Sequence, residues 1–94
     1  MPRLWNRTVR LSAKQAVELE PGVVLPPGKY EATKTRTDFQ TMSGGVSWTP
    51  PRYTIEFTAD QFASMGATDS ENLISRKIDV TPLVRARRLL QHWH

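Results

Sequence analysis

The side chains of this 94-residue chain that could carry acid–base or metal chemistry are two histidines and a few carboxylates. His92 and His94 are the third-from-last and last residues, and a fraying chain end cannot hold an imidazole rigidly between two catalytic partners. Two histidines also fall short of the four ligands of a closed zinc site, and the chain has no cysteine. We therefore expect no catalytic triad, no bound metal and no other cofactor.

Carboxylates offer a second route to catalysis, because two of them can act as an acid–base pair. The candidates are Glu31, Glu56, Asp60 and Asp79. Solvated strand edges and helix caps are the more common roles of such residues, and we expect those roles here. The Gly44-Gly45 pair matches neither the Walker pattern nor the dinucleotide-binding pattern. The sequence thus predicts a protein that is not an enzyme.

Cationic side chains are concentrated at the two ends of the chain. Residues 1–17 carry four basic residues and residues 80–94 carry three, with no acid in either segment. The remaining residues include six basic and nine acidic side chains, so that the whole chain has a net charge of +4. If the fold brings the two ends together, they form a surface suited to phosphate groups. The candidate residues of this surface are Arg3, Arg7, Arg10, Arg85, Arg87 and Arg88.

Residues 38–51 are expected to form a loop that contacts a partner. The Pro50-Pro51-Arg52-Tyr53 segment matches the Pro-Pro-x-Tyr motif of WW-domain ligands. Tyr53 also starts an alternating strand, which predicts a buried ring and disfavours that interpretation. The apolar, aromatic and proline residues of the loop favour a protein partner. The candidate contacts are Phe39, Met42, Trp48, Pro50 and Pro51.

Alternation of apolar and polar residues indicates several strands. The segments are 8–11, 17–20, 23–25, 30–37, 53–57 and 73–80. Two Pro-Gly breaks only a few residues apart favour antiparallel pairing, so we expect a meander. An alternative at residues 12–15 is a capping box that opens a helical turn.

Two helices are expected, over residues 59–65 and 82–93. Thr58 and Gln61 form the capping box of the first helix, and Gly66 ends it. The second helix starts with Pro82 and has an apolar stripe opposite Arg85 and Arg88, with Arg87 at the margin of the stripe. Three interpretations of that helix remain open: packing on the sheet, binding of phosphates, or docking of its stripe on a partner or membrane surface.

These elements predict a single α+β domain, dominated by β structure, over residues 1–94. We expect about five short antiparallel strands in a small curved sheet or open barrel, closed by the two helices. The expected core residues are Val9, Leu11, Val17, Leu19, Val24, Tyr30, Ile55, Phe57, Phe62, Met65, Ile74, Ile78, Leu83 and Leu90.

The favoured function is a non-catalytic binding module, acting as an adaptor, assembly factor or inhibitor of another protein. A nucleic-acid-binding protein that uses the terminal arginines, with Trp5 and Trp93 among them, is the alternative. A small enzyme is the third interpretation. No apolar run approaches the length of a membrane span, and residues 1–17 lack the apolar stretch of a secretory signal, so we expect a cytoplasmic protein.

Overall fold

Strands make up most of the described chain. The structure is a computed structural model that describes residues 3–40, 44, 46–48, 50–67 and 75–92. The elements in chain order are β1 (Arg3–Ala13), β2 (Val17–Glu20), β3 (Val23–Leu25), β4 (Gly28–Gln40), β5 (Val46–Trp48), β6 (Arg52–Phe57), α1 (Ala59–Ser64), β7 (Arg76–Asp79), α2 (Thr81–Arg85) and β8 (Leu90–Gln91). No helix within these residues is long and apolar enough to cross a membrane.

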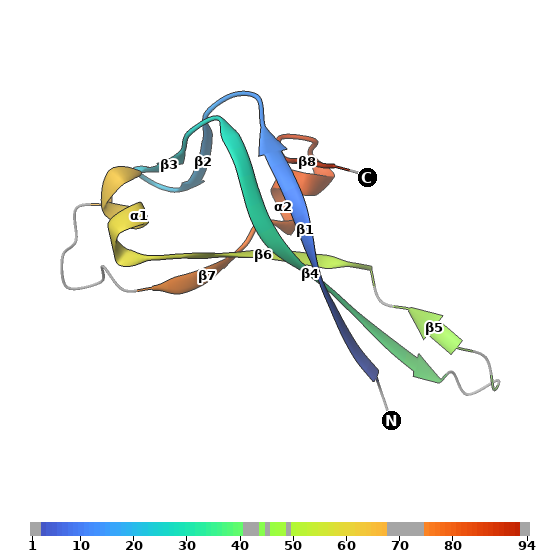
Figure 1. The fold of residues 1–94 in the computed structure, drawn as a ribbon. Coiled ribbons are helices and arrows are strands. Elements are labelled where there is room, and N and C mark those ends of the chain that lie inside the picture. The colour runs from blue at the N-terminus through green and yellow to red at the C-terminus, as the bar shows by residue number, and fades with distance from the viewer. Residues whose placement is uncertain (1–2, 41–43, 45, 49, 68–74, 93–94) are drawn as a thin grey trace.

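The main sheet has the strand order β7-β6-β4-β1-β8, and β5 pairs with β4 beside this path. All of its pairings are antiparallel. Strands β2 and β3 form a separate hairpin, which lies near α1 in Figure 1. The prediction of a small β-dominant α+β fold with an antiparallel sheet and two helices is confirmed, although the second helix is shorter than expected.

Strands β1 and β4 form a long antiparallel pair in the main sheet, and both strands are longer than expected. They pair without interruption from Arg3 opposite Asp38 to Ala13 opposite Gly28. The expected loop over 38–51 is therefore wrong in part, because β4 continues to Gln40 and residues 46–48 form β5, which pairs with it. Backbone pairing satisfies the N–H and C=O groups that a loop would leave to water. The helical turn considered for residues 12–15 is also wrong, since β1 runs through Ala13.

Helix α1 follows its sequence signals closely. Thr58 and Gln61 form the predicted capping box, with Gln61 Oε1 accepting from the Thr58 N–H at 2.8 Å. Gly66, with φ of 106°, ends the helix. The Val24 N–H donates to the Met65 carbonyl at 2.9 Å, so the end of α1 holds the β2–β3 hairpin against the domain.

The core lies between the sheet, α1 and the β2–β3 hairpin. Of the expected core residues, seven are buried, namely Val9, Leu11, Val17, Ile55, Phe57, Phe62 and Met65. Four more pack against them while partly buried: Leu19, Tyr30, Ile78 and Leu83. Ile74 lies outside the described residues. The expectation for Val24 is wrong, because a strand alternates sides and β3 buries Val23 and Leu25 instead.

The C-terminal segment differs most from expectation. The predicted helix over 82–93 ends after one turn at Arg85, and the chain then turns to form β8. Leu90 and Gln91 of β8 pair with the edge of β1, and the His92 N–H donates to the Arg10 carbonyl at 2.9 Å. A continued helix would leave this edge of β1 unpaired. Leu89 is fully buried by the turn, whereas Leu90, an expected core residue, is only half-buried.

A small hydrogen-bond network fixes α2 and β8 to the sheet. The buried Thr81 Oγ1 accepts from the Tyr53 N–H at 2.8 Å, and the Val80 N–H donates to the Tyr53 carbonyl at 2.8 Å. The Tyr53 hydroxyl donates to Gln91 Oε1 of β8 at 2.9 Å. The ring of Tyr53 is buried, as predicted from its strand position. This network gives the segment between α2 and β8 a defined place relative to β1.

Candidate anion-binding surface

The fold brings the two cationic ends of the chain together. Because β8 is hydrogen-bonded to β1, the residues before and after β8 lie next to the first strand. The turn between α2 and β8 carries Arg87 and Arg88, and the end of β1 leads into Lys14. All three cationic side chains are exposed and line one open hollow of about 360 Å³.

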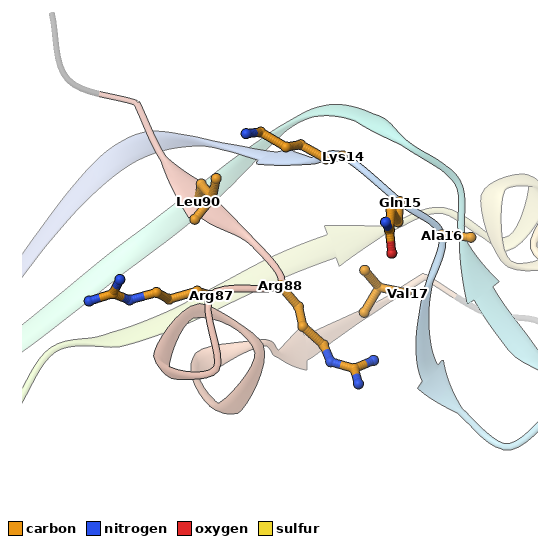
Figure 2. A pocket seen from close by; sticks show the side chains of 7 residues that line it. All are labelled: Lys14, Gln15, Ala16, Val17, Arg87, Arg88 and Leu90. Atoms are coloured by element: carbon orange, nitrogen blue, oxygen red, sulfur yellow. The ribbon is translucent and has the colours of Figure 1, made fainter.

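The lining of this hollow contains no acidic residue. Gln15, Ala16, Val17 and Leu90 complete it. Figure 2 shows Lys14 and Arg87 extending to the same side with Leu90 between them, while Arg88 extends the other way. The three positive charges are therefore spread along the surface. Such a spread suits an extended anion that bears several charges, more than a small ion held at a single point.

Arg87 occupies an unusual backbone conformation. Its φ is 60°, and it is the only non-glycine residue with positive φ in the part of the chain that the structure describes. The Arg88 N–H donates to the Leu83 carbonyl at 2.9 Å and the Arg87 N–H to the Val84 carbonyl at 3.1 Å. These are the two bonds of a Schellman motif, in which the residue at the position of Arg87 is usually glycine.

Helix α1 ends with the same motif but with glycine in that position. The Ala67 N–H donates to the Phe62 carbonyl at 3.0 Å and the Gly66 N–H to the Ala63 carbonyl at 3.2 Å. The chain thus contains both the ordinary form of the turn and a costlier form with arginine. A strained residue that carries a charge at the surface is a candidate for function.

Two further predicted residues, Arg7 and Arg10, lie on β1 and are exposed. They line a second hollow of about 370 Å³ together with His92 and Glu31. Glu31 lies directly opposite Arg10 in the β1–β4 register, so this hollow mixes both signs of charge. The two hollows adjoin the same edge strand of the sheet, because Leu90 of β8 lines the first and Gln91 of β8 lines the second. The hollow at Lys14 is the better anion site, since its lining has no acid.

The other predicted arginines contribute less. Arg85 is exposed in the last turn of α2 and does not line either hollow. Arg3 starts β1 at the far end of the strand from Lys14. The candidate surface predicted from the sequence contained only arginines and therefore did not include Lys14. The pairing of β1 with β8, which brings Lys14 to the arginines, has no local signal in a segment that looks helical.

The candidate partner contacts are described only in part. Phe39 lies in β4 and Trp48 in β5, where the register sets Phe39 opposite Ser47 and Trp48 opposite Asp38. Pro50 is exposed and Pro51 is half-buried. Met42 lies outside the described residues. Because the Tyr53 ring is buried, the Pro-Pro-x-Tyr segment does not present its tyrosine to a WW domain.

Two of the carboxylates considered for catalysis lie at or just before the start of a helix. Asp60 lies in the first turn of α1, where an anion interacts favourably with the helix dipole. Asp79 accepts a hydrogen bond from the Thr81 N–H at 2.9 Å and pairs with Arg52. Partial burial opposes ionisation of Asp79, but the bonds from Thr81 and Arg52 outweigh it and lower the pKa of this carboxyl group. Burial raises the pKa of Tyr30, whose hydroxyl donates to the Pro26 carbonyl.

Metal-ligating side chains do not gather in the described part of the chain, where no group of three or more His, Asp or Glu could hold an ion. His94, one half of the His-x-His pair, lies outside the described residues. Comparison of the chain with protein-family models, curated proteins and solved structures finds no match. Its candidate function therefore depends on the geometry of its own residues.

Proposed function

We propose that this chain is a non-catalytic module that binds nucleic acid along the edge formed by β1 and β8. The observation that carries the proposal is the acid-free hollow lined by Lys14, Arg87 and Arg88. A phosphate backbone supplies the extended series of negative charges that such a surface attracts. Among the interpretations of the terminal arginines, this one agrees best with their arrangement.

The length of the edge also favours a polymer. Lys14 directly follows the end of β1 and comes seven positions after Arg7, or about 23 Å at the usual rise per residue of a strand. One strand of B-form DNA places about seven phosphates along that distance. Several cations along one edge can therefore contact several phosphates of one ligand, and each contact adds to the affinity by releasing counterions.

The test is fluorescence anisotropy with labelled single-stranded and duplex DNA, titrated with protein between about 50 and 200 mM salt. We expect binding that weakens steeply as the salt concentration rises. Lys14→Ala combined with Arg88→Ala should weaken binding and reduce the slope of log K against log salt by about 0.7 to 0.9 for each phosphate that the protein no longer neutralises.

The single variant Lys14→Ala has a matched control in Lys77→Ala. Lys77 is an exposed cation on β7, at the opposite edge of the sheet, and its removal changes the net charge by the same amount as the removal of Lys14. Equal weakening by Lys14→Ala and Lys77→Ala would mean that net charge alone attracts DNA. An absence of binding even at low salt would overturn the proposal.

A protein partner is the second candidate function. It is favoured by the paired strands β4 and β5, which contain Phe39 and Trp48. This β4–β5 extension projects away from α1 and the β2–β3 hairpin in Figure 1. The test compares affinity capture from native lysate by the wild-type chain and by Pro50→Ala, because Pro50 is an exposed residue beside this extension. A single protein held by the wild type and not by the variant would support this candidate. A wild-type chain that retains no protein would argue against it.

A further inference from the structure

In the outer half of the β1–β4 ribbon, β1 stands clear of the core. The side chains of four successive β1 residues, from Trp5 to Thr8, are all exposed, and burial begins only at Val9. Figure 1 shows this part of the ribbon extending toward the N-terminus, away from α1 and the hairpin. Because both faces of the strand meet solvent there, packing does not explain which residues it carries.

The two faces of this ribbon carry different side chains. Residues directly opposite each other in an antiparallel pair share a face. The register sets Trp5 opposite Arg36 and Arg7 opposite Lys34, so that one face holds an aromatic ring and three cations. The other face is neutral here, with Thr8 opposite Thr33 and with the Thr35 hydroxyl donating to Asn6 Oδ1 at 2.8 Å.

The register places two arginines next to the position of Trp5. Directly opposite positions have Cβ atoms about 5 Å apart, and next-but-one positions along a strand are about 7 Å apart. The Cβ atoms of Arg36 and Arg7 are therefore within about 5–7 Å of the Cβ atom of Trp5. The Lys34 ammonium lies 5.6 Å from the centre of the Tyr53 ring, which holds it in place. At the outer end of the ribbon, Arg3 lies opposite Asp38 in the register.

We propose that Trp5 is a stacking site for an unpaired base of single-stranded nucleic acid, with Arg7, Arg36 and Lys34 beside the neighbouring phosphates. This inference rests on the proposed function and names the form of its ligand. Trp5 is 39% exposed, so much of its large apolar ring is open to water. A base that covers the ring removes apolar surface from water while the flanking cations attract the backbone.

Unpaired bases fit this site better than a duplex. A base inside a double helix has both faces covered by its neighbours and offers only its edges in the grooves. An indole ring stacks on the face of a base, and single strands expose that face. The adjoining cations account for affinity that depends on salt, and the ring accounts for affinity that does not.

The experiment compares Trp5→Ala and Trp5→Phe with the wild type for binding of labelled oligo(dT) of about 16 nucleotides. Removal of the stacking ring should weaken binding by about 5- to 150-fold, and phenylalanine should restore most of it. The salt slope should stay unchanged in Trp5→Ala, because that variant keeps every cation. Arg7→Ala, as the matched variant on the same face, should instead lower the slope by about 0.7.

The outcomes separate the stacking site from the proposed function. A wild-type chain that binds oligo(dT), with Trp5→Ala binding equally well, overturns the stacking site and leaves nucleic-acid binding intact. Tighter binding of duplex than of oligo(dT) by the wild-type chain likewise overturns the stacking site and leaves nucleic-acid binding intact. A wild-type chain that binds neither ligand overturns both proposals. Because Trp5 lies outside the core, thermal unfolding of Trp5→Ala should match that of the wild type and confirm that the variant is folded.

Discussion

Replacing Arg87 by glycine should stabilise the protein while weakening its interaction with anions. Arg87 has φ of 60°, a conformation that costs a residue with a Cβ atom about 1–2 kcal/mol and costs glycine almost nothing. Glycine loses more chain entropy on folding, which offsets about 0.5–1 kcal/mol of that gain. The net expectation for Arg87→Gly is a stability increase of about 0.5–1 kcal/mol.

Thermal unfolding provides the assay. For a domain of this size, 1 kcal/mol shifts the unfolding midpoint by about 4–8 °C, so Arg87→Gly should raise it by about 2–8 °C. Arg87→Ala is the matched control, since it removes the same charge but keeps the Cβ atom in the left-handed conformation. Its midpoint should not exceed that of the wild type.

The end of α1 offers the reverse substitution. Gly66 occupies the same position in its Schellman motif, with φ of 106°, and an added Cβ atom would lie 2.6 Å from the Gly22 carbonyl oxygen. Gly66→Ala should therefore destabilise the protein by more than the backbone cost of about 1 kcal/mol. If Arg87→Gly lowers the midpoint, or if it does not exceed Arg87→Ala, the argument from backbone strain is refuted.

Three further predictions concern the junction of α2 with the sheet. Leu89→Ala should lower the free energy of unfolding by about 2–5 kcal/mol and Leu90→Ala by clearly less, because only Leu89 is fully buried. Chemical denaturation measures both, and an equal loss in the two variants would favour the continuous helix instead. Thr81→Val should cost about 1–3 kcal/mol, because it leaves the buried Tyr53 N–H without its acceptor, whereas Thr81→Ser should restore most of the denaturation midpoint. The folded state lowers the pKa of Asp79. The ionised Asp79 therefore contributes its full stabilisation above the pKa of an unfolded aspartate, about 3.9. This stabilisation is lost as the pH falls from there through the lower pKa that Asp79 has in the folded protein. In unfolding experiments at a series of pH values, Asp79→Asn should remove this loss of stability at acid pH. At neutral pH the variant should be less stable by about 0–1 kcal/mol, because it loses the exposed ion pair with Arg52. An unchanged acid profile would refute the role given to Asp79.

Local signals in the sequence determined much of the fold. The capping box at Thr58 and Gln61 and the glycine at position 66 set the limits of α1, because both act through bonds within a few residues. Alternation placed Ile55 and Phe57 in the core, since a strand turns successive side chains to opposite sides. The cationic composition of the two ends was likewise evident from the chain alone.

Tertiary structure decided the rest, and with it the candidate sites. The apolar spacing after Pro82 suits a helix, but pairing with the open edge of β1 converts Leu90 and Gln91 to strand and turns the chain at Arg87. That pairing joins residues about eighty positions apart, a distance over which no local pattern operates. The register of β1 with β4 similarly places Trp5 beside Arg36, and only the paired strands reveal which residues share a face.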